Sequence, residues 1–162
     1  AVRERVAQDR LPLLSLVQAE PLQVQSSHLS FQEFYAARAI CSGRALSGPL
    51  PWQWGVWWAN ALRLGDEMGS AFEQGLLRAA GVEGHALDLC KRVGGDRATA
   101  CQAVTILLKS GTLTQVDLSK NELGPSQAKA LVDGGAFGAS VTSINLEGNN
   151  FGSEGAKALA PA

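Results

Sequence analysis

Cysteine is scarce in this chain of 162 residues, and its three cysteines, Cys41, Cys90 and Cys101, are odd in number and widely spaced. No C-x-x-C pair occurs, so the sequence indicates neither a disulfide framework nor a zinc site. Reduced thiols are typical of the cytoplasm, where we expect this protein to reside. The chain also lacks an apolar run of the roughly 18 residues that a membrane span requires, and it lacks a signal segment. We therefore expect no membrane partner.

Motifs of catalysis are missing as well. No P-loop, G-x-G-x-x-G, H-E-x-x-H or G-x-S-x-G sequence is present. The two histidines, His28 and His85, have no metal-ligand spacing to a cysteine or carboxylate. We therefore expect a protein that is not an enzyme and holds no metal. The charges are balanced, with 14 Lys and Arg against 15 Asp and Glu, and they are mixed along the chain. This balance argues against a nucleic-acid partner.

A repeated segment dominates the C-terminal part of the sequence. "LTQVDLSKNELGPSQAKALV" begins at Leu113 and "VTSINLEGNNFGSEGAKALA" begins at Val141, 28 residues later. Both copies follow the pattern L-x-x-L-x-L-x-x-N-x-L-G of leucine-rich repeats, whose period is about 20 to 29 residues. The pattern predicts an α/β solenoid, or horseshoe, with short parallel strands near Gln115–Leu118 and Ser143–Leu146. A helix should follow each strand on the convex side.

A weaker copy, "ALDLCKRVGG", precedes the two clear ones. Leu87 and Leu89 take the places of Val116 and Leu118, whereas Arg92 stands where the asparagine should be. We interpret this segment as a degenerate first repeat. In the clear copies, the asparagines should turn inward and satisfy backbone groups of the loop. Two clear repeats are fewer than the three or so that stability usually needs, so the preceding helices should cap the stack.

Side-chain alternation along the two strands places polar residues on the concave face of the predicted sheet. The candidate partner-binding residues are Gln115, Asp117, Ser119, Ser143, Asn145 and Glu147. Concave solenoid faces bind proteins, and we expect a protein ligand there. The alternative, that these side chains are simply solvated, stays open.

The segment "SSHLSFQEFYAARAI" predicts the start of a helix with one apolar face. Ser30 and Glu33 fit a capping box, and Leu29 and Phe34 have the spacing of a hydrophobic staple. His28 would then lie two residues before the cap, at the positive end of the helix dipole. A histidine beside free N–H groups is placed to hydrogen-bond an anion such as phosphate. The alternative is that His28 only fills the corner between a strand and the helix.

The rest of the N-terminal half is predicted from weaker patterns. Residues 1–10 should form a helix, and "PLLSLVQAEPLQVQSSH" should form a hairpin that turns at Ala19–Pro21. A helix should open at Pro51, and a second amphipathic helix, which contains Met68, should end near Gly81.

All four tryptophans lie in the cluster "PWQWGVWW". A stacking platform for bases or sugars is one interpretation, but such platforms usually carry interleaved Lys or Arg. We favour burial of Trp54, Trp57 and Trp58 between helices.

The segment "SSHLSFQEFYAARAI" resembles the H-x-S-F-Q-E-F-x-A-A sequence of NACHT-type NOD-like receptors, which are STAND ATPases of innate immunity. In that family the segment closes a winged-helix domain and opens a helical domain. The repeats resemble the ribonuclease-inhibitor type that follows the helical domain. The resemblance covers most of the chain and is weakest in the tryptophan-rich segment. It implies a winged-helix remnant at residues 1–28, a helical domain at 29–85 and leucine-rich repeats at 86–162.

The resemblance also implies a role for His28, which matches the histidine that hydrogen-bonds the β-phosphate of ADP. We expect no cofactor in this chain itself, because it has no P-loop. The ADP or ATP would be held by a nucleotide-binding domain that lies upstream in the same polypeptide. Because the sequence starts at Ala1 and ends with "ALAPA", we expect a fragment. The resulting interpretation is a non-catalytic, ligand-sensing and protein-interaction arm of a NOD-like signalling ATPase. The alternative is a leucine-rich-repeat scaffold, inhibitor-like or GTPase-activator-like, without an ATPase domain.

Overall fold

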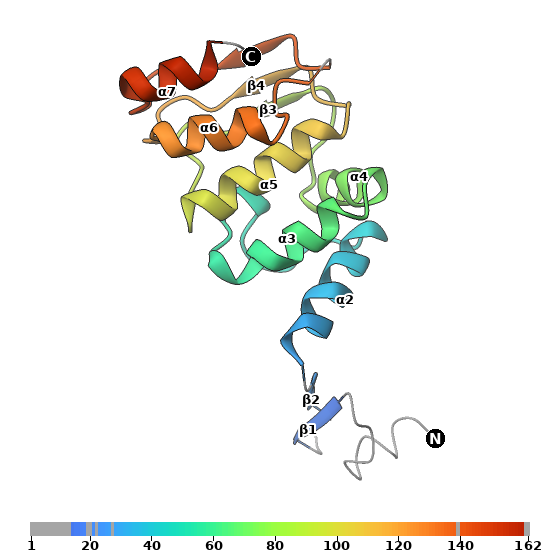
Figure 1. Cartoon of the computed structure of the whole chain (residues 1–162). Coiled ribbons are helices and arrows are strands. Elements are labelled where there is room, and N and C mark those ends of the chain that lie inside the picture. Colours follow the sequence, from blue (N-terminus) through green and yellow to red (C-terminus); the bar gives the residue numbers. More distant parts are fainter. Residues whose placement is uncertain (1–13, 19–20, 22, 27, 139, 161–162) are drawn as a thin grey trace.

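The computed structural model describes residues 14–18, 21, 23–26, 28–138 and 140–160. The chain forms in turn a two-stranded hairpin, a group of helices and a stack of three strand–helix units (Figure 1). This order confirms the predicted mixed class, in which a helical region precedes an α/β solenoid with short parallel strands. Within the described segments, no helix has both the length and the apolar character that crossing a bilayer requires.

The hairpin consists of β1 (Leu14–Gln18) and β2 (Gln23–Ser26), which pair antiparallel. Leu16 lies opposite Val24, and the register shifts between Leu16 and Gln18. The predicted hairpin is therefore confirmed. Most of its predicted turn, and the helix predicted at residues 1–10, lie outside the described residues.

Helix α2 (Leu29–Cys41) begins one residue before the predicted cap. His28 is the N-cap residue, no side chain caps the helix, and Ser30 lies inside the first turn. The predicted capping box is wrong because the Glu33 carboxylate instead accepts a hydrogen bond from the Asn60 side chain. The predicted staple fails with it, since Leu29 is itself helical and 55% exposed.

The tryptophan-rich segment forms two 3-10 turns, η1 (Pro51–Gln53) and η2 (Val56–Trp58), ahead of α3 (Ala59–Asp66). A single helix from Pro51 was expected, and that prediction is wrong. Trp54 is extended, with ψ 144°, and its carbonyl accepts a hydrogen bond from the Asp96 N–H at 3.0 Å. The extended backbone at Trp54 interrupts any helix between η1 and η2, and its carbonyl fastens this segment to the first repeat.

Helix α4 (Ser70–Ala79) matches the predicted amphipathic helix except at its start, because Met68, which was predicted to lie in the helix, is in the turn before it. It packs closely on α2 at Gly75, where a Cβ would lie 2.2 Å from the carbonyl oxygen of Ile40. Only glycine permits this approach.

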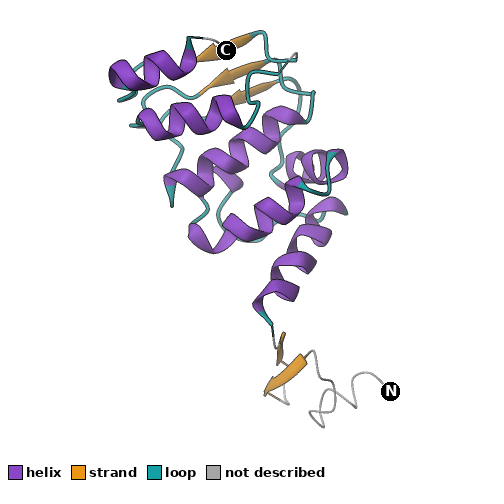
Figure 2. Cartoon of the chain, in the orientation of Figure 1, coloured by secondary structure: helices purple, strands orange, loops and turns teal. Residues whose placement is uncertain are grey.

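The repeats form a parallel sheet with strand order β3-β4-β5. Its strands are β3 (Ala86–Asp88), β4 (Gln115–Asp117) and β5 (Ser143–Asn145). The following helices are α5 (Arg97–Lys109), α6 (Pro125–Asp133) and α7 (Gly152–Leu159), which lie on one side of the sheet (Figure 2). Leu87 pairs with Val116, and Val116 with Ile144, so the degenerate first repeat and both clear repeats are confirmed.

The core runs through the repeats and continues into the helical region. In the second repeat, the four apolar positions of the motif, Leu113, Val116, Leu118 and Leu123, are at most 4% exposed. Their counterparts in the third repeat, Val141, Ile144, Leu146 and Phe151, are only partly buried, because they pack on a neighbouring unit from one side. Helix α5 is buried over most of its length because η1, α3 and α4 cover it on one side and α6 on another.

Candidate functional site

The face of the sheet that turns away from α5, α6 and α7 is the concave face of the stack. Equivalent positions of the three repeats line up across it in two rows. Ala86, Gln115 and Ser143 form the first row, and Asp88, Asp117 and Asn145 form the second. A shallow groove of about 340 Å³ runs along these rows.

The second row is held in place by a hydrogen bond that recurs in each repeat. The side chains of Asp88, Asp117 and Asn145 accept from the backbone N–H two residues later, at 2.9, 2.8 and 3.0 Å respectively. Neighbouring repeats are also joined, since Asn145 Nδ2 donates to Asp117 Oδ2 at 2.9 Å. These side chains therefore have fixed positions before any partner binds.

Asp117 lies at the centre of this row. Hydrogen bonds from the Ser119 side chain and the Ser119 N–H lower the pKa of the Asp117 carboxyl below its usual 3.8, and the Asn145 amide and Lys120 act in the same direction. The centre of the face thus carries a negative charge at neutral pH.

The structure brings together most of the predicted partner-binding residues. Gln115, Ser143, Asn145 and Glu147 are exposed, and Asp117 is half-buried. Ser119 is the exception, because it is 3% exposed and its carbonyl accepts from the Asn121 amide at 3.1 Å, so its predicted exposure on the concave face is wrong. The strand ends at Asp117, and the side-chain alternation that placed Ser119 outward ends there too.

Asp88 was missed by the sequence argument, although it is exposed and belongs to the same row. Its position, 29 residues before Asp117, is the signal that could have identified it.

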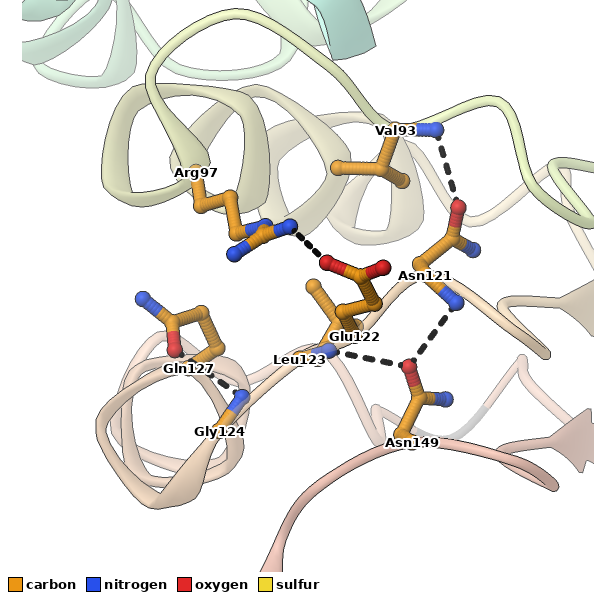
Figure 3. Close-up of polar contacts among 8 residues, drawn as sticks. All are labelled: Val93, Arg97, Asn121, Glu122, Leu123, Gly124, Gln127 and Asn149. Atoms are coloured by element: carbon orange, nitrogen blue, oxygen red, sulfur yellow. Dashed lines mark hydrogen bonds and ion pairs between the residues drawn. The ribbon is translucent and has the colours of Figure 1, made fainter.

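A second set of contacts fastens the loops behind the strands (Figure 3). Asn121 Oδ1 accepts from the Val93 N–H at 3.0 Å, and Asn149 Oδ1 accepts from the Asn121 and Leu123 N–H groups at 3.1 and 3.0 Å. Each asparagine therefore binds the loop of the preceding repeat as well as its own turn, which confirms the predicted role. An ion pair between Arg97 and Glu122, at 2.5 Å, joins the first two repeats nearby.

The helical region takes the place of a preceding repeat at the N-terminal end of the stack. The Trp52 carbonyl accepts from the Gly94 N–H at 2.9 Å, and the Trp54 carbonyl accepts from the Asp96 N–H at 3.0 Å. The guanidinium of Arg92, which replaces the motif asparagine, lies 5.7 Å from the centre of the Trp52 ring. The preceding elements therefore cap the stack, as predicted.

The tryptophans divide into a buried set and an exposed one. Trp52 and Trp54 are 3% and 1% exposed, and Trp58 stacks on Trp54 with ring centroids 4.0 Å apart. Trp54, Trp57 and Trp58 were predicted to be core residues. The prediction is confirmed for Trp54 and for Trp58, which is partly buried against the core. It is wrong for Trp57, which lies in the 3-10 turn η2 and is 79% exposed.

His28 is exposed and lies edge-on to Phe31, with ring centroids 5.8 Å apart. Its position at the N-terminus of α2 is thus close to the predicted one, while its contact with a nucleotide phosphate stays a prediction. In the described part of the chain, no three His, Cys, Asp or Glu residues are grouped as metal ligands. The three cysteines are free thiols, and burial raises the pKa of Cys101 to about 12.

Comparison with known proteins identifies the repeats. The family model described as Leucine Rich repeat matches residues 109–132 and 139–160. These segments contain β4 with all but the last residue of α6, and β5 with α7, and the unit of β3 and α5 extends the same architecture by one repeat. Searches of curated proteins and of solved structures find no match. Leucine-rich repeats suggest a role in protein interaction.

Proposed function

We propose that this chain is the non-catalytic interaction and sensing arm of a NOD-like signalling ATPase, and that its concave face binds a protein partner. The observation that carries the interaction role is the row of Asp88, Asp117 and Asn145, which is exposed or half-buried and held by its own hydrogen bonds. Preorganised polar groups lose little conformational entropy on binding, which favours affinity.

The chemistry of the row favours a partner segment that presents hydrogen-bond donors. Asp88 and Asp117 contribute carboxylate oxygens, and Gln115 and Asn145 contribute amides. A backbone N–H, an arginine or a lysine of the partner would satisfy these acceptors, and charge-assisted hydrogen bonds are the stronger ones.

The wider context of a NOD-like ATPase rests on the order of the elements and on the resemblance at "SSHLSFQEFYAARAI". A hairpin precedes His28, helices follow it, and the repeats come last. In this proposal the exposed imidazole of His28 hydrogen-bonds the β-phosphate of ADP held by an upstream domain. The chain would then hydrolyse nothing by itself and act in the cytoplasm.

Site-specific crosslinking tests the interaction role. A photo-crosslinking amino acid is placed at Gln115 on the concave face or, as a control, at the exposed Ala130 on α6. In extract from the native source, the probe at position 115 should capture a protein that the probe at position 130 does not. The product should disappear with Asp117→Lys. Equal capture at both positions would contradict a role for the concave face.

The rate of ADP release from the full-length parent protein tests the nucleotide role. In this proposal the bond from His28 to ADP helps to hold the parent protein in a closed, inactive state. Loss of that charge-assisted hydrogen bond in His28→Ala should shift the equilibrium toward the open state by about 10- to 150-fold and speed ADP release. Ser30→Ala is the control, because Ser30 does not cap α2 and its loss should change stability by less than about 0.5 kcal/mol. Unchanged ADP release in His28→Ala would mean that His28 does not hold the phosphate and only fills the corner between β2 and α2. A full-length protein that binds no ADP would favour the scaffold without an ATPase.

A further inference from the structure

A pocket of about 360 Å³ lies outside the repeats, between the second half of α2, the loop that follows it and the tryptophan pair. Its lining includes Ala36, Ala39, Arg44, Pro49, Trp54 and Trp58, and most of its surface is apolar. Its volume is within the range of about 300–1,000 Å³ typical of small-molecule sites.

Small side chains on the helix leave the space for this pocket. Ala36 and Ala39 are one turn apart on α2, so their methyl groups form one shallow wall. Opposite them, the indole N–H of Trp54 donates to the Pro49 carbonyl at 2.8 Å. Trp58 stacks on Trp54 with an interplanar angle of 15°. The aromatic wall is thus fixed in place without a ligand.

Arg44 supplies the only charge among the residues that line the pocket. Its side chain is exposed, and among the described residues it has no ion-pair or hydrogen-bond partner. A guanidinium without a carboxylate beside an apolar cavity favours an anionic ligand group, and it disfavours the cations that tryptophan rings otherwise attract.

We propose that this pocket binds a small, flat ligand with an aromatic body and a carboxylate. The aromatic body would lie against Trp58 and the alanine wall, and the carboxylate would accept hydrogen bonds from Arg44. This site belongs to the helical region and is independent of the concave face and of any upstream ATPase.

The probe is 2-naphthoate, titrated into the full 162-residue chain, with uncharged 2-naphthamide as the matched ligand. Binding is followed by the indole N–H resonances of the four tryptophans, each assigned by its Trp→Phe variant. The resonances of Trp54 and Trp58 should shift and saturate, whereas that of the exposed Trp57 should not move. The amide should bind about tenfold or more weakly, because it cannot form the charge-assisted bond.

Two variants separate the aromatic and ionic contributions. Arg44→Gln should lower the affinity for 2-naphthoate to that of the amide, and Ala39→Leu, at an exposed helical position, should fill the pocket and abolish binding of both ligands. Arg63→Gln is the control, because Arg63 of α3 pairs with Glu67, the residue after that helix, and does not line the pocket. The proposal is overturned by shifts confined to Trp57, by equal affinity for the two ligands, by unchanged binding in Arg44→Gln, or by no saturable shift at millimolar concentrations.

Discussion

Asn149 Oδ1 accepts a hydrogen bond from the backbone N–H of Asn121 at 3.1 Å, and this bond joins the same motif position of two successive repeats. Asn121 makes the corresponding bond to Val93 in the first repeat. The loops after the strands lack backbone hydrogen bonds of the sheet, and asparagine side chains accept from their N–H groups instead. The free-energy cost of burying those N–H groups without a partner is thus avoided.

Asn121→Ala should be among the more damaging single substitutions in the repeats. Asn121 is 4% exposed, and its amide donates to the carbonyls of Leu89 and Leu118, both at 2.9 Å. Its loss leaves several buried groups unpaired, so the free energy of unfolding should fall by about 2–4 kcal/mol. Urea denaturation measures this loss. The exposed Asn150 is the control. A similar loss of stability in Asn150→Ala would show that the hydrogen bonds of Asn121 are not the cause.

The tryptophans should differ sharply in their contributions to stability. Trp54→Ala removes a ring that is 1% exposed and should cost about 3–5 kcal/mol. Trp57→Ala removes a ring that is 79% exposed and should change stability by less than about 0.5 kcal/mol. Thermal unfolding of the two variants tests the difference, and equal losses would show that Trp57 packs against the protein in solution.

Gly75→Ala should push α4 away from α2. The added methyl group would lie 2.2 Å from the Ile40 carbonyl oxygen, so we expect a loss of at least about 1–3 kcal/mol in the free energy of unfolding. Gly55→Ala is the control, since φ is −88° there and no atom lies within 4 Å of the new Cβ. Urea denaturation should find Gly55→Ala neutral or slightly stabilised. A neutral Gly75→Ala would mean that the two helices are not in close contact.

Acid should weaken the N-terminus of α5 through Asp96. The Thr99 N–H and hydroxyl donate to its carboxylate at 2.8 and 2.7 Å and hold the pKa of Asp96 below its usual 3.8. A carboxyl group whose pKa is lower in the folded state stabilises the fold above about pH 4, and this contribution is lost as pH falls through the folded value. Asp96→Ala should cost about 1 kcal/mol at pH 7.

Asp96→Asn provides the control for the pH effect, because asparagine also caps helices but does not titrate in this range. As the pH is lowered from 7 to below the folded-state pKa of Asp96, the free energy of unfolding should fall more for the wild type than for Asp96→Asn. Urea denaturation at each pH measures this difference. Parallel pH profiles for the two proteins would show that Asp96 does not contribute to the acid sensitivity.

The repeats could be predicted from the sequence because each key position has a strict backbone or packing requirement. Val116 and Leu118 must face the core, and Asn121 must reach the neighbouring loop, so the same residue types recur after 28 residues. The first repeat keeps the core leucines, Leu87 and Leu89, but has no motif asparagine. It has no earlier repeat to bind, because the carbonyls of Trp52 and Trp54 contact its loop instead.

The remaining differences arise where a partner distant in sequence decides the conformation. Glu33 fits a capping box locally, yet the Asn60 amide of α3 offers it another bond. Trp54 has helical spacing, yet its carbonyl is needed by Asp96. At Ser119 the strand has already ended, so alternation no longer predicts which side chains reach the concave face. None of these partners is visible within a local window of sequence.

The backward reach of Asn149 also gives the stack a mechanical polarity. Among the described residues, the third repeat packs on the second repeat alone, its apolar side chains are only partly buried, and its asparagine fastens it to the second repeat. A force that pulls the chain from its C-terminal end would peel this unit away before it disturbs the buried α5. Each released unit of 28 residues, the offset from Asn121 to Asn149, adds roughly 95 Å of contour length, so the domain would lengthen under load in discrete steps.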